Sequence, residues 1–410
     1  MKASKGTSFT SWRAQSLAVL LPVLLLPCLA HAQRELSCLN RLSSKDSLIV
    51  ADPDGRILVS KNETIHFIPA STLKLLTSLA ALHHLGPDHR FLTEFAVDSK
   101  HNLKIRAYGD PLLISEVWRE VAGILSKKTC NVNNLLLDTT YFSHPIVIPG
   151  RHRSTNPYDA PVGALCANFN TVFFDRDKKG KIVSAEKQTP LIPYARKKIL
   201  SLGLKKGRYT FSHDPEDAAR YAGELLGYFL KRRGVKFNGK ILLGTSNPED
   251  KIILSYRSPF TLEQVLKKML EFSSNFIANQ ITIALGARVC APPGNLPKGV
   301  RVLNGYAAKK LGLKNITVVE GSGISRKNRV SALDMLVVLK RFEPYRRLLV
   351  RKDNVFFKTG SLRGIRTRAG YIQATDGIYS FVVYLKGEDL RIDFLMECMK
   401  RDIEDPGVRR

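Results

Sequence analysis

A serine and a lysine three residues apart open a stretch that should form a buried helix. Ser71 and Lys74 begin the apolar run 70–82. Because positions three apart share one helix face, the Lys74 amine can take the proton of the Ser71 hydroxyl and make it a nucleophile. Amides at a helix N-terminus would favour developing negative charge. The alternative is a helix cap with a snorkelling lysine, and Ser184 and Lys187 repeat the spacing in a polar stretch.

Two further groups of polar residues could act with this pair. Ser273, Ser274 and Asn275 stand where one predicted helix ends and the next begins, so a hydroxyl could relay a proton beside an amide that holds a substrate. Alone, this triplet is more simply a polar helix junction, and residues 154–156 fit the same spacing.

The third group is Lys358, Thr359 and Gly360, which follows the apolar strand 355–357. Lysine and threonine there can bind a carboxylate, while glycine lets a substrate backbone come close to the strand. Alone, the tripeptide would more often be a strand-end turn. The order and context of the three groups match the motif set of serine β-lactamases and penicillin-binding proteins.

The elements that must position these groups are predicted to form a sheet covered by helices. A hairpin is predicted at 47–51 and 56–60, about a turn at 52–55 whose Pro and Gly suit tight reversal. A capping box at Thr261 and Gln264 begins a helical segment. Further helices are predicted up to residue 286 and at 302–311, 332–341 and 389–401, and strands at 355–357, 369–373 and 378–385.

The fold class expected from this order is α+β, an antiparallel sheet covered by helices. Residues 90–255 have a different texture, with short strand-like runs between polar loops, and we interpret them as a mostly β insert. The predicted division is a signal peptide at 1–32, a catalytic domain at 33–89 and 256–410, and one or more inserted domains at 90–255.

On these motifs the sequence resembles the class C low-molecular-mass penicillin-binding proteins, the D-alanyl-D-alanine carboxypeptidase/endopeptidases. This family has a transpeptidase domain like that of β-lactamases, with extra domains between its first two motifs, as the gap from Lys74 to Ser273 suggests. The chain departs in having Ser274 where Asp is usual and in a somewhat shorter insert. Other matching stretches lie at 108–111, 138–142, 158–161, 320–326 and 358–362, so the resemblance covers about 40–400.

The resemblance implies a role for each motif residue. Ser71 would attack the carbonyl between two D-alanines, Lys74 would be its general base, and Ser273 would relay a proton to the leaving D-alanine. Asn275 would hold the substrate amide and Lys74. A lysine can be a base only if partly neutral, which burial and the charge of Lys358 would favour by lowering its pKa.

The remaining residues implied by the resemblance bind the substrate. Lys358 and Thr359 would bind the terminal carboxylate, Gly360 belongs to the same strand motif, and the amides of Ser71 and Ser361 would form the oxyanion hole. Asp138 would lie near the substrate side-chain amine, with a strand-end turn residue as its alternative. The run 321–323 would support the fold.

The N-terminus indicates export from the cytoplasm. A basic start, the apolar core 17–26 and the small residues Ala30 and Ala32, on either side of His31, form a secretory signal peptide, whose removal takes away three basic and no acidic residues. No later segment has the roughly 18 apolar residues of a membrane span. The expected place is the periplasm or another extracytoplasmic space, although an uncleaved anchor stays open.

Composition limits the partners. Of 410 residues 44% are hydrophobic and 24% charged, which excludes disorder, and the net charge of +28 falls only to +25 without the signal. Outside the cytoplasm this charge suits an anionic wall or membrane surface and makes nucleic acid an improbable partner. Cysteines remain at 38, 130, 166, 290 and 398, enough for one or two disulfides of undetermined pairing.

We expect no metal and no cofactor, because His83, His84 and His89 suit a helix C-terminus and no cluster has ligand spacing. The predicted function is a serine-type D-alanyl-D-alanine carboxypeptidase that acts on peptidoglycan peptides through an acyl-enzyme and is inhibited covalently by β-lactams, with an additional endopeptidase activity left open. The alternatives are a catalytically silent wall-binding or β-lactam-sensing protein and a serine β-lactamase. The sequence leaves open the balance of the two peptidase activities, the third peptide residue, oligomeric state, partner enzymes and membrane association.

Overall fold

The computed structural model describes residues 42–387 and 392–404, so the predicted signal peptide and Cys38 lie outside the described residues. Near the start of this part, β1 (Ser47–Ala51) and β2 (Ile57–Lys61) form the predicted hairpin. The Asp52 carboxylate accepts hydrogen bonds from the amide and side chain of Arg56, and Gly55 has φ +85°. The turn residues therefore close the hairpin as their types require.

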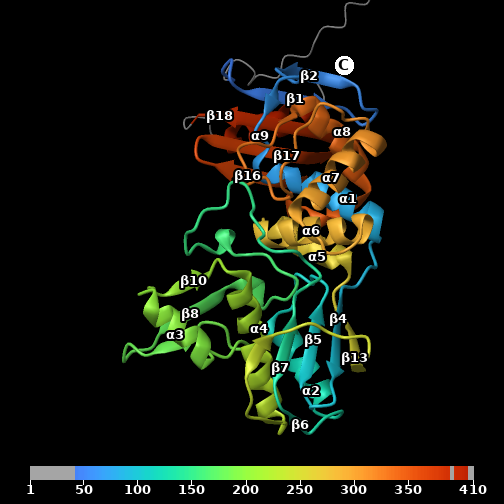
Figure 1. Ribbon diagram of the computed structural model, residues 1–410. Helices are drawn as coiled ribbons and strands as arrows, with labels where there is room; N and C mark the ends of the chain where they lie inside the picture. The colour runs from blue at the N-terminus through green and yellow to red at the C-terminus, as the bar shows by residue number, and fades with distance from the viewer. Residues whose placement is uncertain (1–41, 388–391, 405–410) are drawn as a thin grey trace, which may run out of the picture. The chain divides into compact units, whose positions relative to one another are not determined.

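The hairpin extends a sheet built mainly from the end of the chain. Its order is β15-β16-β17-β18-β1-β2, and in Figure 1 the blue strands lie beside the red ones. The late strands are β15 (Val350–Lys352), β16 (Val355–Leu362), β17 (Ile365–Ala374) and β18 (Gly377–Lys386), all paired antiparallel. The predicted reversal between the last two is confirmed, since Ala374 pairs with Gly377. The expected α+β class with an antiparallel sheet is confirmed.

Alternating side chains divide the sheet into two buried faces. Phe381 and Val383 of β18 pack in one cluster with Leu395 and Met399 of α9 (Ile392–Glu404). Val382 and Tyr384, one residue out of step, belong to the other cluster, which contains α1 and α8. Period-two alternation of apolar residues thus lets helices cover both faces.

The covering helices largely follow the predictions. The Thr261–Gln264 capping box is present, with Gln264 N donating to Thr261 Oγ1 and Thr261 N to the Gln264 side chain. The helices of this part are α1 (Lys74–Leu85), α5 (Leu262–Glu271), α6 (Asn275–Cys290), α7 (Leu296–Leu311) and α8 (Ala332–Phe342).

The segment 90–255 corrects one prediction, since it is mixed rather than mostly β. Its main sheet has the order β12-β7-β5-β4-β13 and includes parallel pairs. These strands are β4 (Leu92–Val97), β5 (Leu103–Ala107), β7 (Leu135–Asp138), β12 (Ile241–Leu243) and β13 (Lys251–Arg257). Smaller pairings involve β6 (Asn131–Val132) with β11 (Lys236–Phe237), and β8 (Val172–Arg176) with β9 (Ile182–Ser184) and β10 (Gly207–Tyr209).

Three α-helices in this segment were missed: α2 (Ser115–Leu125), α3 (Pro193–Ser201) and α4 (Pro215–Arg232). In α4, Asp214 caps the N-terminus by accepting from Glu216 N, and Pro215 stands at the first position. Its buried residues recur at helical spacing, including Ala218, Ala222, Leu225 and Phe229. The pattern is a normal helix signal that charge-rich neighbouring stretches obscured.

The described residues belong to one compact unit, and the division into a catalytic domain and an insert stays a prediction. A short pair, β3 (His66–Phe67) with β14 (Val330–Ser331), completes the strands. Within the described ranges, no helix is both long and apolar enough to cross a membrane.

Candidate active site

Ser71 lies in a 3₁₀ turn, Ala70–Leu73, that leads directly into α1, rather than in the first turn of the α-helix itself. Ala70 has φ +46°, a left-handed conformation that costs a residue with a side chain about 1–3 kcal/mol. The residue capping α1 is Leu73, without a side-chain hydrogen bond. Ser71 is therefore not the helix cap of the alternative interpretation.

The Lys74 amine is completely buried and has three partners. Its Nζ lies 2.9 Å from Ser71 Oγ, 2.8 Å from Asn275 Oδ1 and 2.7 Å from the Ser322 carbonyl oxygen. With an exposed fraction of 0%, the side chain does not snorkel. A neutral amine has two hydrogens and one lone pair. It can therefore donate to the two oxygens that only accept and receive the hydroxyl proton of Ser71.

The surroundings favour this neutral form. Burial, followed by the positive charge of Lys358, lowers the pKa of Lys74 well below its ordinary value, while the Glu320 carboxylate opposes the shift. The two causes are those expected from the sequence. Lys74 is thus equipped to act as a general base.

A strand and a loop brace the backbone at Ser71. The Pro69 carbonyl accepts from Thr72 Oγ1 at 2.7 Å and from Thr367 Oγ1 of β17 at 2.9 Å. A Cβ on Gly323 would lie 1.8 Å from the Ala70 carbonyl oxygen, so the loop that follows Glu320 packs directly on the turn. The strained turn is held from both sides.

The motif at Lys358 lies inside β16, which runs to Leu362 instead of ending at residue 357 as predicted. Lys358 is buried, donates from Nζ to the Thr359 carbonyl at 2.9 Å, and burial lowers its pKa to about 8. A Cβ on Gly360 would lie 2.7 Å from Ser71 N. Only glycine allows β16 this close to the turn.

The same part of β16 has an open edge. On one side, residues 355–362 pair with β17, but on the other β15 pairs only with 355–357. Among the described strands, none pairs with Lys358, Thr359, Gly360 or Ser361 on that side. An extended peptide can add to such an edge through backbone hydrogen bonds. Thr359 and Ser361 are exposed there.

The junction between α5 and α6 carries the remaining motif. Ser273 has φ +52°, and Ser274 caps α6 by accepting from Ile277 N at 3.2 Å. Capping requires only a small oxygen acceptor, which accounts for the serine where the family usually has Asp. Asn275 reaches Lys74, as described, whereas Ser273 is half-buried and makes no such contact.

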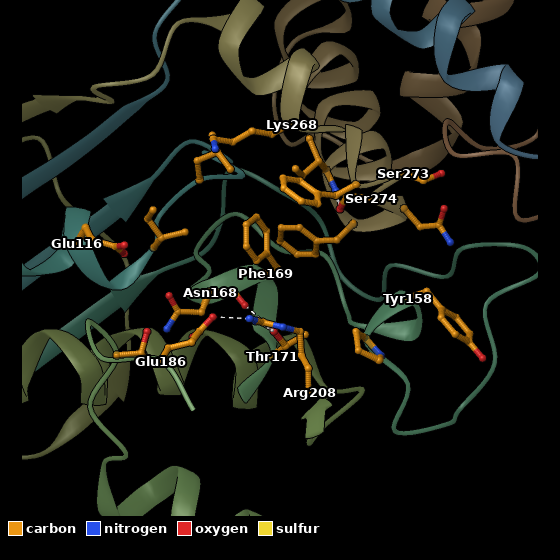
Figure 2. Close-up of a pocket in the computed structure, with 18 of the residues that line it drawn as sticks. Glu116, Tyr158, Asn168, Phe169, Thr171, Glu186, Arg208, Lys268, Ser273 and Ser274 are labelled. Carbon is orange, nitrogen blue, oxygen red and sulfur yellow. Dashed lines mark hydrogen bonds and ion pairs between the residues drawn. The ribbon is translucent and has the colours of Figure 1, made fainter. Parts of the chain in front are cut away.

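A cavity of about 590 Å³ adjoins this junction (Figure 2). Phe169 lies in its middle, with Ser273 and Ser274 on one side and the ion pair of Glu186 and Arg208 on another. The Phe169 ring meets Phe276 edge-on, with centroids 6.2 Å apart. Residues 168–170 all have positive φ, so a strained turn of the segment 90–255 supports the helix that carries Asn275.

Sequence reasoning missed Ser322 and Glu320 as parts of the site. The buried Glu320 carboxylate accepts from Ser322 N at 2.7 Å, Ser322 Oγ at 2.6 Å and Gly323 N at 2.7 Å. It thereby holds the carbonyl that binds Lys74. An acid followed by Gly-Ser-Gly was the available signal, although it suggested only a support for the fold.

Asp138 is not brought to this group. At the end of β7, its carboxylate accepts from the amide and hydroxyl of Thr140 and from Ser246 N. Burial opposes its ionisation, but these bonds hold the pKa of Asp138 below its ordinary value. The contacts are those of a strand-end turn residue, and a role in substrate binding stays a prediction.

The competing motif matches form no comparable group. Ser184 Oγ donates to the Glu186 carbonyl of its own turn, and Ser154 Oγ donates to Asp159. Among the described cysteines, Cys130, Cys166 and Cys290 are free and Cys398 is disulfide-bonded. No group of three or more possible metal-ligating side chains occurs in the described ranges.

Comparison with known proteins agrees with this geometry. Residues 40–203 and 201–348 match the model of the D-Ala-D-Ala carboxypeptidase 3 (S13) family. The chain is 25% identical to the D-alanyl-D-alanine carboxypeptidase DacB of Haemophilus influenzae, covering 81% of this chain and 83% of that protein. It is 23% identical to a D-alanyl-D-alanine carboxypeptidase of an Actinomadura species, covering 83% and 77%.

Solved structures share the fold. Penicillin binding protein 4 of Haemophilus influenzae matches with a TM-score of 0.71 and 22% identity, over 88% of this chain and 96% of that one. A predatory peptidoglycan endopeptidase of Bdellovibrio bacteriovorus matches with a TM-score of 0.52 and 16% identity, over 87% and 91%. Because the family model covers well over half of the sequence, the chain belongs to the D-Ala-D-Ala carboxypeptidase 3 (S13) family, and so to the class C low-molecular-mass penicillin-binding proteins.

Proposed function

We propose that this serine-type D-Ala-D-Ala carboxypeptidase cleaves peptidoglycan peptides through an acyl-enzyme on Ser71. The observation that carries the proposal is the Lys74 amine, which is fully buried, 2.9 Å from Ser71 Oγ and bonded to two further oxygens. No bulk solvent is needed to take the proton, since the base already faces the hydroxyl. Endopeptidase activity on D-alanyl crosslinks uses the same chemistry.

In the first step, Ser71 Oγ attacks the carbonyl carbon between the two D-alanines while its proton moves to Lys74. The amides of Ser71 and Ser361 would hold the resulting oxyanion, an assignment supported by the close approach of β16 to Ser71 N. The substrate would lie along the open edge of β16. Its terminal carboxylate would bind Lys358 and Thr359.

In the second step the carbon–nitrogen bond breaks. The leaving D-alanine needs a proton, which Ser273 would relay from Lys74, while Asn275 holds both Lys74 and the substrate amide. Water then attacks the Ser71 ester, with Lys74 again as base, and releases the shortened peptide. In a β-lactam the broken ring keeps the leaving nitrogen attached to the acyl group, so we expect a long-lived adduct.

Related proteins support this part of the proposal. A structure of Haemophilus influenzae penicillin binding protein 4 is described as complexed with a β-lactam, and one of the Bdellovibrio endopeptidase as acylated by penicillin G. We extend β-lactam binding to this chain as a proposal. Secretion through a cleaved signal peptide at 1–32, a periplasmic or other extracytoplasmic location and attraction to anionic surfaces belong to the same proposal.

The test is intact-mass spectrometry after brief exposure to benzylpenicillin, followed over time. Wild-type protein should gain one adduct that peptide mapping places on Ser71, and S71A should gain none. Ser184→Ala is the matched control, because Ser184 has the same spacing to a lysine but bonds its own turn.

The adduct's lifetime separates the alternatives. A persistent adduct supports a peptidase, whereas an adduct that disappears as drug is consumed would indicate a β-lactamase. An equal adduct on S71A, or loss of the adduct in S184A, would overturn the assignment of the nucleophile. Release of D-alanine from a peptide ending in D-Ala-D-Ala then measures the peptidase reaction directly.

A further inference from the structure

A second cavity, of about 510 Å³, lies in the segment 90–255 and is lined by positive charge. Its cations come from three places in the chain: Arg119 from α2, Lys187 from the loop after β9, and Arg232 and Arg233 from the end of α4. No acidic side chain is among the lining residues. Like charges converging in a concave site repel one another, and a bound anion would relieve that repulsion.

Nearby acids do not neutralise these cations. The Glu186 carboxylate, next to Lys187 in sequence, is paired with Arg208. Glu120, next to Arg119, lies close enough to Tyr256 that burial, together with the charge of Glu120, raises the pKa of that phenol, and Glu116 lines the other cavity. Within the described ranges, none of the four cations forms an ion pair, and their donors are available to a ligand.

Two of the arginines are nevertheless held in place. A Cβ on Gly123 would meet Nη2, Cζ and Nε of Arg233 at 3.6, 3.7 and 3.7 Å, so this guanidinium lies flat on α2. The Arg232 guanidinium lies 6.0 Å from the centre of the Tyr228 ring. Contacts with a helix backbone and with the face of a ring hold the groups without occupying their hydrogen-bond donors, as a preorganised anion site requires.

The end of a helix favours cations by itself, which would account for Arg232 and Arg233. It does not account for Arg119, which lies in the middle of α2, or for Lys187, which lies in a loop. The convergence of three segments is therefore the feature that points to a ligand.

We propose that this cavity binds a phosphate-bearing ligand. Planar guanidinium groups match the oxygens of a phosphate bidentately, and four cations call for more than the single charge of one carboxylate. Phosphate groups are available outside the cytoplasm both on lipid headgroups and in soluble form. The site is separate from Ser71, since none of its lining residues belongs to the catalytic group.

The experiment measures binding of inorganic pyrophosphate by titration calorimetry and of phosphatidylglycerol vesicles by sedimentation, with phosphatidylcholine vesicles as the neutral reference. The test variant is Lys187→Gln with Arg232→Gln, two exposed side chains. Lys178→Gln with Lys179→Gln removes the same charge from an exposed turn of the same segment and is the matched control. Ser71→Ala is included to separate this site from catalysis.

We expect the test variant to weaken binding about tenfold or more, as loss of two charge-assisted contacts predicts, and the control to change it less than about twofold. If the test variant binds both pyrophosphate and phosphatidylglycerol vesicles more weakly, the ligand is a lipid headgroup. If only pyrophosphate binding is weakened, the ligand is a soluble phosphate. Equal weakening by test and control variants, or no binding of either probe to the wild type, would overturn the proposal. Normal benzylpenicillin acylation of the test variant shows that it is folded, and unchanged binding by S71A shows that the two sites fail independently.

Discussion

Replacement of Gly360 by alanine tests whether β16 must lie against the serine turn. The new Cβ would be 2.2 Å from Thr367 Oγ1, 2.7 Å from Ser71 N and 2.9 Å from Ala70 Cβ. The Thr367 hydroxyl can rotate, but Ser71 N is backbone and is held in a braced turn. The strand must therefore move away by several tenths of an ångström or more.

Two consequences follow, of different size. Overpacking of this kind costs about 1–3 kcal/mol in the free energy of unfolding. Displacement of β16 also moves the Ser361 amide from the oxyanion, and loss of one such donor lowers the rate about 10²–10³-fold. We therefore expect acylation by benzylpenicillin to fall about a hundredfold, with a protein that is destabilised but folded.

Gly305→Ala is the matched control. Gly305 lies in α7, and a Cβ there would have nothing within 4 Å, so alanine should stabilise the helix by up to about 1 kcal/mol and leave acylation unchanged. Acylation rates by mass spectrometry and urea unfolding measure both effects. Acylation of G360A within about twofold of wild type would refute the close approach of strand and turn, and with it the proposed oxyanion hole.

Three other perturbations separate the parts of the site. The first is the pH profile of kcat/KM, which should rise as Lys74 loses its proton at its lowered pKa and fall as Lys358 loses its charge near pH 8. The variant K358R stays charged and should move the fall to higher pH. A wild-type profile that is flat to pH 10 would contradict this reasoning. Glu320→Gln places a side-chain NH2 group against the amides of Ser322 and Gly323, which are themselves donors. It should lower the free energy of unfolding in urea by about 3 kcal/mol and slow acylation. Unchanged stability and acylation would show that the carboxylate does not hold Ser322. Asp138→Asn should lower the free energy of unfolding by about 1–2 kcal/mol at neutral pH, and this difference should disappear as the pH falls through the lowered pKa of Asp138. Acylation by penicillin should be unchanged. A selective rise in KM for a peptide with a side-chain amine would instead support the predicted role of Asp138 in substrate binding.

Local chemistry made much of the fold predictable. The hairpin at Asp52 and Gly55, the capping box at Thr261 and the alternating strands of β17 and β18 depend on residues close in sequence. The motif at Lys358 was found, but not that its strand continues to Leu362. Strand length there depends on pairing with β17, which a sequence window does not contain.

The site's chemistry was less accessible for the same reason. That Lys74 meets Asn275 was implied only by family resemblance, because 201 residues separate them. The Ser322 carbonyl carries no side-chain signal, since any residue has one. Asp138 shows the opposite error, in which a matching stretch suggested a substrate contact where the carboxylate bonds its own turn.

The same features that were hardest to predict are costly for folding. Two lysines are buried near one another, and Ala70 and Ser273 have left-handed backbones, each an expense that neutral packing would avoid. Two of these features act directly on Ser71 and Lys74. The buried Lys358 lowers the pKa of Lys74, and the strained turn brings Ser71 to both Lys74 and β16. A chain selected for stability alone would replace the two buried lysines and relax Ala70, so their position around the Ser71 hydroxyl supports the proposal that Ser71 is the reacting group.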